Sequence, residues 1–287
     1  NAKFSGNIKV DNKDLKGMEL YEISLMISSV FQNPKTHFFN VDTTLELLFY
    51  LENIGLDRKE MESRMEDMLK LFPIKHLLGR SIFDLSGGEK QILCVAACYI
   101  SGCKIIVLDE PSSNLDDTYI DILKEMLHIL KNKGITLIIA EHRIYYLTDL
   151  ADRIILVRKG ELFKELTKDE LLNSEKQLGL RSAIKTVLKA QNKSVGNDLN
   201  IKKLEYNFKD GSGLKMEDIS FGLGNIYGIT GKNGCGKSTF IRVMTGLDDR
   251  GKSEITFDGK TLNKKDRLKN SSLVMQDVNH QLFTDSV

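Results

Sequence analysis

The stretch Leu85-Ser86-Gly87-Gly88-Glu89-Lys90-Gln91 decides the fold, together with Ile105-Ile106-Val107-Leu108-Asp109-Glu110 a short helix later. The first stretch opens an apolar helix with a Ser-Gly-Gly turn, and the second is an apolar strand that ends in two carboxylates. Carboxylates placed in this way act on a nucleotide phosphate, but the loop that would hold a phosphate comes only at Gly231–Ser238. The motifs therefore stand in an inverted order along the chain.

The composition is that of an ordinary globular protein. Of the 287 residues, 41% are hydrophobic and 28% charged, and the net charge is +1, so bulk charge points to neither nucleic acid nor an anionic membrane. No apolar run is long enough to span a bilayer, so we expect membrane contact only through a partner. The four cysteines include no Cys-x-x-Cys pair, which indicates reduced thiols in a cytosolic compartment. Because the chain begins at Asn1 and stops within a pattern, we interpret it as a fragment.

Strands are expected to alternate with helices over residues 1–180. Lys104–Asp109 and Thr136–Ala140 are typical of buried strands, and Asp117–Lys131 is an amphipathic helix between them. A helical pattern runs from Leu45 to about Leu78, ahead of the helix that Ser86 opens. This alternation predicts an α/β fold with a mainly parallel sheet, covered on both faces by helices.

The rest of the chain repeats its beginning. Residues 181–200 are rich in Lys, Asn and Ser, which predicts a linker, and a new strand pattern starts at Ile201–Phe208 in the part that spans 201–287. Val30-Phe31-Gln32-Asn33 aligns with Val274-Met275-Gln276-Asp277, and Ile8–Asn12 aligns with Ile255–Gly259. These matches indicate a tandem duplication of one domain.

The stretch Gly231–Ser238 has the pattern Gly-x4-Gly-Lys-Ser, directly after the apolar stretch Ile226–Thr230, which we expect to be a strand. Its glycines allow backbone N–H groups to point at phosphate oxygens, Lys237 adds a point charge, and the Ser238 hydroxyl is a ligand for Mg²⁺. Phe208 either stacks on adenine or belongs to the core, and both readings stay open. The predicted ATP-binding residues are Phe208, Gly231, Asn233, Gly234, Cys235, Gly236, Lys237, Ser238 and Thr239.

Polar residues that follow the apolar strands complete the candidate site. Asp109 is expected to hold Mg²⁺ through water, and Glu110 to polarise the water that attacks the γ-phosphate. His142 follows the strand that ends at Ala140, which is where open α/β sheets bind ligands. The amides of the repeated glutamines could also ligate Mg²⁺, so the predicted metal ligands are Ser238, Gln276, Asp109 and Gln32.

Together these motifs resemble the nucleotide-binding subunit of ABC transporters, and most closely the energy-coupling-factor ATPases, which drive uptake of vitamins or metal ions. The resemblance implies a P-loop NTPase fold with an antiparallel β subdomain and a helical subdomain at about residues 44–100. It also implies hydrolysis of ATP with Mg²⁺, a transmembrane transporter subunit and a second ABC unit as partners, and a place on the cytoplasmic face of the membrane. In such a pair, Ser86, Gly87, Gly88, Glu89 and Gln91 would contact the ATP of the other unit, and Asp116 would belong to the D-loop.

The sequence also departs from that family. Ile92 and Cys98 occupy positions where many relatives carry Arg, and the part before the linker lacks a P-loop of its own. Gly231 could face the signature across a tandem pair of units. Alternatively, Ile226–Thr230 could fill a gap beside the Asp109 strand and form a circularly permuted core, which we favour. Two other functions stay open, namely an impaired remnant and a soluble ABC ATPase acting on nucleic acid or ribosomes.

Overall fold

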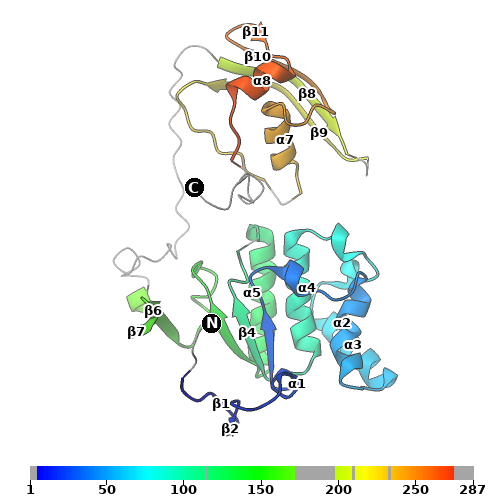
Figure 1. Cartoon of the computed structure of the whole chain (residues 1–287), viewed down its shortest axis with the longest axis vertical. Coiled ribbons are helices and arrows are strands. Elements are labelled where there is room, and N and C mark those ends of the chain that lie inside the picture. Colours follow the sequence, from blue (N-terminus) through cyan, green and yellow to red (C-terminus); the bar gives the residue numbers. More distant parts are fainter. Residues whose placement is uncertain (1–4, 114, 172–197, 209–210, 232–233, 275–287) are drawn as a thin grey trace. The chain divides into compact units, whose positions relative to one another are not determined.

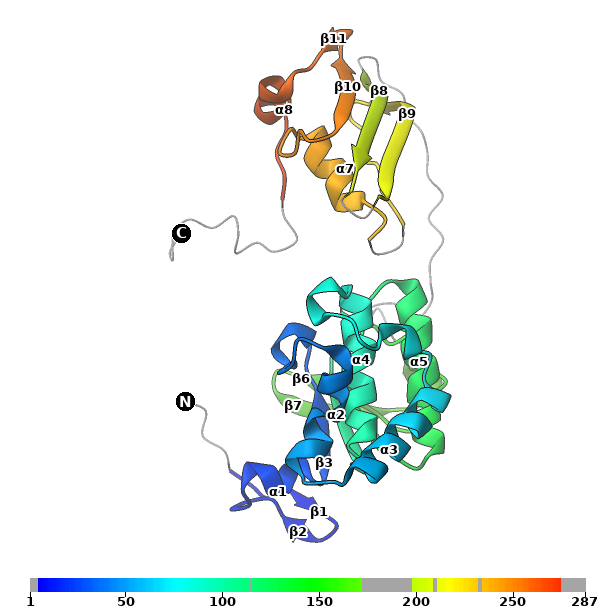
Figure 2. The same ribbon diagram turned by 90° about the vertical axis from the view of Figure 1, so that its right-hand side faces the viewer.

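The computed structural model divides into two compact units, Asn1–Thr186 and Val187–Val287. It describes residues 5–113, 115–171, 198–208, 211–231 and 234–274 (Figures 1 and 2). Most of the predicted linker 181–200, Asn233 and Gln276 therefore lie outside the described residues.

The centre of unit 1 is a parallel sheet with the strand order β3–β4–β5. Its strands are β3 (Ile27–Val30), β4 (Ile105–Asp109) and β5 (Thr136–Ala140). On one face, Ile106 and Leu108 are fully buried in a single core with residues of the helices. On the other face, Ile138 is 55% exposed. The expectation that helices cover both faces is therefore wrong for unit 1, because its helices gather on the side of Ile106.

Helices form most of the remainder of unit 1. They are α1 (Leu20–Ser24), α2 (Thr43–Asn53), α3 (Arg58–Leu71), α4 (Gly87–Ile100) and α5 (Asp117–Asn132). Short 3-10 turns lie at Pro34–Thr36, Lys75–Leu77 and Ile82–Asp84. The helical pattern predicted from Leu45 onward is interrupted at Gly55, whose φ of 74° ends α2. The apolar face of α3 is buried as expected, with Met68 and Phe72 in the core.

Two antiparallel hairpins complete unit 1. β1 (Lys9–Val10) pairs with β2 (Lys13–Asp14), and β6 (Ile154–Arg158) pairs with β7 (Glu161–Leu166). In the described part of the chain, no helix combines the length and the apolar composition needed to span a bilayer.

Unit 2 is an antiparallel sheet with two helices. The strand order is β11–β10–β8–β9, with β8 (Asp198–Asn207), β9 (Gly213–Gly222), β10 (Lys252–Phe257) and β11 (Lys260–Thr261). The helices are α7 (Lys237–Met244) and α8 (Lys264–Asn270). Phe240 and Val243 of α7 are buried with Ile201, Leu204 and Ile255 of the sheet. This sheet is the predicted antiparallel β subdomain.

The predicted repeat recurs as local structure. β1–β2 turns at Asp11 and Asn12 with φ of 47° and 63°, and β10–β11 turns at Asp258 and Gly259 with φ of 48° and 72°. A two-residue turn with positive φ at both positions matches the twist of a hairpin, which explains the Asp-Asn and Asp-Gly pairs. A helix follows each hairpin, α1 in one copy and α8 in the other.

The strand predicted over 226–230 does not form. Ile226 is fully exposed, and this segment pairs with none of the strands in the described ranges. The expected gap beside β4 is also absent, because β4 pairs with β3 on one side and β5 on the other. A strand needs a neighbour for its N–H and C=O groups, and an apolar sequence alone does not supply one. The permuted core, which required both features, is therefore not formed in the described residues.

The core of unit 1 makes a direct stability prediction. Leu93 of α4 is fully buried, so Leu93→Ala should lower the free energy of unfolding by about 2–5 kcal/mol. Leu20→Ala is the matched control, because Leu20 is 84% exposed and should change stability by less than about 0.5 kcal/mol. Urea unfolding followed by helical circular dichroism measures both changes. Equal effects of the two substitutions would contradict the assignment of α4 to the core.

Candidate functional site

The carboxyl ends of the three parallel strands bring three predicted residues together. Gln32 follows β3, Glu110 follows β4 and His142 follows β5. Gln32 Nε2 donates to Glu110 Oε2 at 2.7 Å, and His142 Nδ1 lies 3.4 Å from Glu110 Oε1. Parallel strands in register place their carboxyl ends at one edge, so these contacts follow from the strand pairing. The Glu110 carboxylate is therefore held between an amide and an imidazole.

The backbone turns sharply where β4 ends. Asp109 is the last residue of β4 and its side chain is exposed, whereas Glu110 adopts a φ of 42°. A left-handed conformation is uncommon for a residue with a side chain and is found at functional turns. The Glu110 N–H still donates to the carbonyl of Ala140 at 2.9 Å, which ties the turn to the end of β5. The two carboxylates thus leave the strand in different directions at the same edge.

A buried carboxylate next to His142 was not predicted from the sequence. The Glu141 side chain is 2% exposed and accepts hydrogen bonds from the hydroxyls of Ser112 and Tyr146, and from the N–H groups of His142 and Arg143. Burial opposes ionisation of Glu141, but these donors outweigh it and lower its pKa. The available signal was a charged residue directly after an apolar strand.

Asp116 has a visible structural role. It is the N-cap of α5, and its side chain accepts a hydrogen bond from the N–H of Tyr119 at 3.1 Å. An N-cap carboxylate satisfies an N–H group that lacks a partner in the first helical turn. The predicted D-loop residue therefore fixes where α5 begins.

The Ser-Gly-Gly turn begins α4 as predicted. The Ser86 hydroxyl accepts from the N–H of Glu89 at 3.2 Å, and the Glu89 carboxylate accepts from the N–H of Ser86 at 2.7 Å. This reciprocal pair is a capping box. Arg80 donates to the other Glu89 oxygen at 2.9 Å. Although burial opposes it, the Ser86 and Arg80 donors lower the pKa of Glu89.

The other signature residues differ in exposure. Gly87 is exposed, whereas Gly88 and Gln91 are buried. A Cβ atom added at Gly88 would lie 2.5 Å from ring atoms of Tyr119, so glycine is required for close packing of α4 on α5. Gln91 is 1% exposed and occupies the position of a core residue. Its predicted contact with ATP stays a prediction.

The P-loop of unit 2 curls tightly before α7. Gly231, Gly234 and Gly236 have φ of 154°, 79° and 95°, and Lys237 Nζ donates to the carbonyl of Gly231 at 2.6 Å. A Cβ at Gly231 would lie 2.6 Å from Cys235 Sγ, which explains the glycine there. Cys235 and Ser238 are exposed, and Thr239 is half-buried. An anion at this loop would meet the α7 N-terminus and the Lys237 ammonium.

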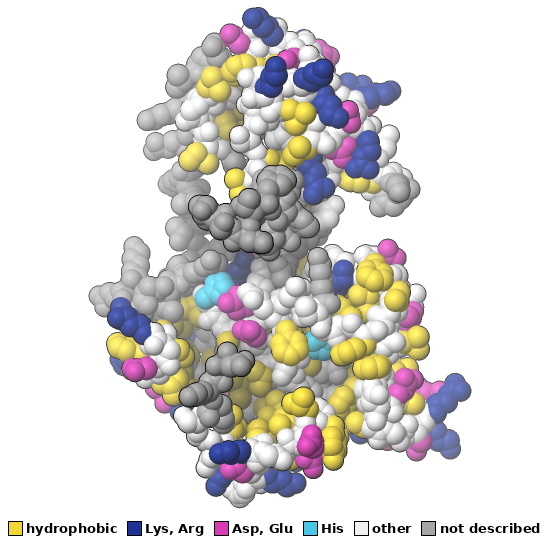
Figure 3. All heavy atoms as spheres, viewed as in Figure 1, with side chains coloured by type: hydrophobic (Ala, Val, Ile, Leu, Met, Phe, Trp, Pro, Cys, Tyr) yellow, Lys and Arg dark blue, Asp and Glu magenta, His cyan; other side chains and the backbone are white. Residues whose placement is uncertain are grey.

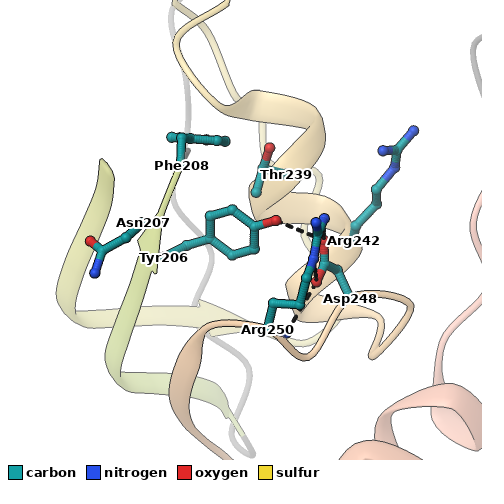
Figure 4. Close-up of a pocket in the computed structure, with 7 residues that line it drawn as sticks. All are labelled: Tyr206, Asn207, Phe208, Thr239, Arg242, Asp248 and Arg250. Atoms are coloured by element: carbon teal, nitrogen blue, oxygen red, sulfur yellow. Dashed lines mark hydrogen bonds and ion pairs between the residues drawn. The ribbon is translucent and has the colours of Figure 1, made fainter. Parts of the chain in front are cut away.

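A pocket of ≈ 230 Å³ opens beside Phe208 (Figure 4). Arg250 forms a 2.6 Å ion pair with Asp248 and lies 5.5 Å from the centre of the Tyr206 ring. Tyr206 also donates to Asp248 at 3.1 Å, so the floor of the pocket is a polar network. The sequence singled out two of the lining residues, Phe208 and Thr239, and missed the network. All seven are Tyr206, Asn207, Phe208, Thr239, Arg242, Asp248 and Arg250.

The candidate metal ligands suit a Mg²⁺ ion bound together with a nucleotide better than a metal ion held by protein ligands alone. Among the residues that the structure describes, no group of three or more His, Cys, Asp or Glu could hold an ion. Mg²⁺ usually keeps water and substrate phosphates as ligands and takes only one or two from the protein. The exposed Ser238 hydroxyl in unit 2, and Asp109 and Gln32 in unit 1, are of this kind.

The packing of Gly88 leads to a prediction. Gly88→Ala should lower the free energy of unfolding by about 1–3 kcal/mol, because the new methyl group overlaps the Tyr119 ring. In a Tyr119→Ala background the same substitution should have almost no effect. Thermal unfolding of the four proteins in this cycle measures the coupling. Equal losses in both backgrounds would show that Tyr119 is not the obstacle.

Curated proteins are similar to this chain in sequence. A putative ABC transporter ATP-binding protein of Treponema denticola is 41% identical over the whole chain, which covers 61% of that protein. The protein SSO2030 of Saccharolobus solfataricus is 31% identical over 87% of the chain and 52% of its own length. The chain thus spans about three fifths or less of these relatives.

Solved structures show the same fold. The chain is similar to cbiO1 of Clostridium perfringens, part of the ABC transporter complex cbiONQ, with TM-score 0.54 and 27% identity over 60% of this chain and 70% of that one. The ATP-binding cassette MJ0796, a dimer bound to ADP and Pi, has TM-score 0.50 and 22% identity over 57% and 74% of the two chains, and supports the fold alone. The family model for ABC transporters matches residues 2–113 and 214–286. The chain belongs to the ABC transporter family, as one of its ATP-binding proteins.

Proposed function

We propose that this chain hydrolyses ATP to power a membrane transporter. The observation that carries the proposal is the Glu110 carboxylate, which is held by Gln32 at 2.7 Å and faces His142 at 3.4 Å where three parallel strands end. Glu110 is 31% exposed, so water can reach the carboxylate. A carboxylate in this position can accept the proton of an attacking water as general base.

The other predicted residues have matching roles. Lys237 would exchange its bond to the Gly231 carbonyl for a phosphate oxygen, and the P-loop N–H groups would bind the remaining oxygens. Asp109 and Gln32 of unit 1, and Ser238 and Gln276 of unit 2, would each be Mg²⁺ ligands in the site of their own unit, and the ion would neutralise charge on the β- and γ-phosphates. Phe208, which lines the pocket in unit 2, would support the adenine. His142 would donate a hydrogen bond to the γ-phosphate.

A second ABC unit completes each site in this proposal. The N-terminus of α4, with Gly87 exposed, would face the γ-phosphate held by the P-loop of another unit. Ser86 and Glu89 hold the turn in shape through their capping box. Closure on ATP and opening after hydrolysis would then move the membrane partner.

We assign the transporter to the energy-coupling-factor type, which takes up a vitamin or a metal ion. Support comes from the likeness to cbiO1, whose complex is named cbiONQ. Figure 3 shows apolar side chains at the surface of unit 1. The loop between β3 and α2 exposes Phe31, Phe39 and Val41, and the first turn of α2 exposes Leu45. Phe83 is 79% exposed, and the neighbouring Ile82 N–H donates to the Val41 carbonyl. These residues would receive a transmembrane subunit at the cytoplasmic face of the membrane.

Substitution of Glu110 tests the reaction. Glu110→Gln keeps the size of the side chain but cannot accept a proton, so turnover should fall roughly 10²–10⁴-fold while ATP binding is retained. Glu161→Gln, at the exposed turn of β6–β7, is the control and should change neither. Phosphate release and binding of a fluorescent ATP analogue measure the two properties. Unchanged phosphate release in Glu110→Gln would exclude this residue as the base.

Alkylation of cysteines tests the P-loop separately. Cys235 is exposed and should react with iodoacetamide, whereas burial raises the pKa of the Cys98 thiol to about 12 and should keep it inert. Mg·ATP should slow the reaction of Cys235 at least about tenfold by covering the loop, and AMP should not. Mass spectrometry of the labelled peptides gives both rates. Equal rates with Mg·ATP and AMP would contradict phosphate binding at Gly231–Ser238.

A further inference from the structure

We propose that Glu141 is a positioning residue, which joins the backbone that carries His142 to the loop that follows Glu110. The inference rests on the proposed ATP hydrolysis, since His142 and Glu110 take part in it. Glu141 Oε1 lies 3.9 Å from His142 Nδ1, which is beyond hydrogen-bonding distance. Glu141 acts through the two segments that it connects.

The contacts of Glu141 are directed at these two segments. Its Oε1 accepts from the N–H groups of His142 at 2.8 Å and Arg143 at 2.9 Å. Its Oε2 accepts from the hydroxyls of Ser112 at 2.6 Å and Tyr146 at 3.0 Å. One carboxylate oxygen thus holds the switch segment, while the other reaches across 29 residues to Ser112.

A second connection runs parallel to the first. Arg143 Nη1 donates to the carbonyl of Ser112 at 3.2 Å and to the carbonyl of Leu115 at 3.4 Å. The N–H of Arg143 is itself held by Glu141, so the two connections depend on one another. Ser112 lies two residues after Glu110, and Leu115 lies one residue before the α5 cap Asp116. Movement of the loop would therefore displace Glu110 and the switch segment together.

The energetics favour a specific role over simple stabilisation. A buried carboxylate is expensive unless several donors satisfy it, and an apolar side chain of similar size would often stabilise a core equally well. Glu141 accepts five hydrogen bonds, and every donor belongs to a residue of the loop after β4 or the segment after β5. Hydrogen bonds to a charged group have a narrow geometry, so they fix the distance between those segments. These two segments carry Glu110 and His142.

A double-mutant cycle in ATP turnover by the full chain tests the inference. Glu141→Gln keeps the volume of the side chain but turns an NH₂ group toward the hydrogen-bond donors. We therefore expect kcat to fall roughly tenfold to a hundredfold, with KM changed less than about twofold. In a His142→Ala background the same substitution should lower kcat by a clearly smaller factor, because the part of its effect that passes through His142 is already lost. The proposal would be overturned if the two substitutions lowered kcat by independent factors that multiply in the double variant. An unchanged kcat in Glu141→Gln would overturn it as well.

Two further variants serve as a control and as a replacement in this cycle. Tyr146→Phe removes one donor of Glu141 and leaves the Ser112, His142 and Arg143 donors in place, so kcat should change by less than about threefold. Ser112→Ala removes the 2.6 Å hydroxyl bond to Glu141 and leaves only the Ser112 N–H at 3.4 Å, and it replaces Glu141→Gln in the cycle if that variant fails to fold.

Hydrogen exchange separates this proposal from the proposed function. The His142 and Arg143 amides should exchange at least about tenfold faster in Glu141→Gln and remain protected in Tyr146→Phe. Wild-type protein without ATPase activity would contradict the proposed function, while the exchange result would still decide whether Glu141 holds the switch segment. Unchanged exchange of both amides in Glu141→Gln would overturn the connection itself.

Discussion

Parallel pairing of β4 with both of its neighbours is the constraint on which the candidate site depends. The register Val30↔Leu108 and Leu108↔Ile139 places the ends of β3, β4 and β5 level with one another. The strand pairing alone then brings the three site residues together, because each lies within two residues of a strand end. They are Gln32, Glu110 and His142. A slip of one residue would send the side chains to opposite faces of the sheet and separate the amide from the carboxylate.

This constraint explains how much the sequence could predict. Strands β4 and β5, the start of α4 and the placing of Glu110 and His142 at strand ends follow from apolar runs, a capping residue and local spacing. The Glu141 network could not be found in this way, because its partner Ser112 is 29 residues distant and its donors are defined only by the packed structure. Periodicity reports which residues are buried, but not which donor a buried carboxylate meets.

The strand predicted over 226–230 is wrong for the same reason, because a strand also depends on partners that local sequence does not define. The residues Ile226-Tyr227-Gly228-Ile229-Thr230 have the composition of a buried strand, yet Ile226 is fully exposed in unit 2. β-propensity expresses how well a side chain fits a pleated surface, and it has no effect where no neighbouring strand supplies that surface. The glycines of the P-loop behave differently, since a positive φ at Gly234 or Gly236 is a local property that the sequence alone can specify.

Glu89 and Glu141 of unit 1 show how a negative charge can lie close to a proposed anion site without opposing it. Glu89 sits in the first turn of α4, where its charge would repel a phosphate at the helix N-terminus. Arg80 neutralises that charge at 2.9 Å, and the Ser86 N–H occupies the other oxygen. The favourable field at the N-terminus therefore survives. Glu141 lies beside His142, and its charge is taken up by donors on its own two segments. In both cases the carboxylate organises backbone beside the proposed site, and its neighbouring donors balance its charge.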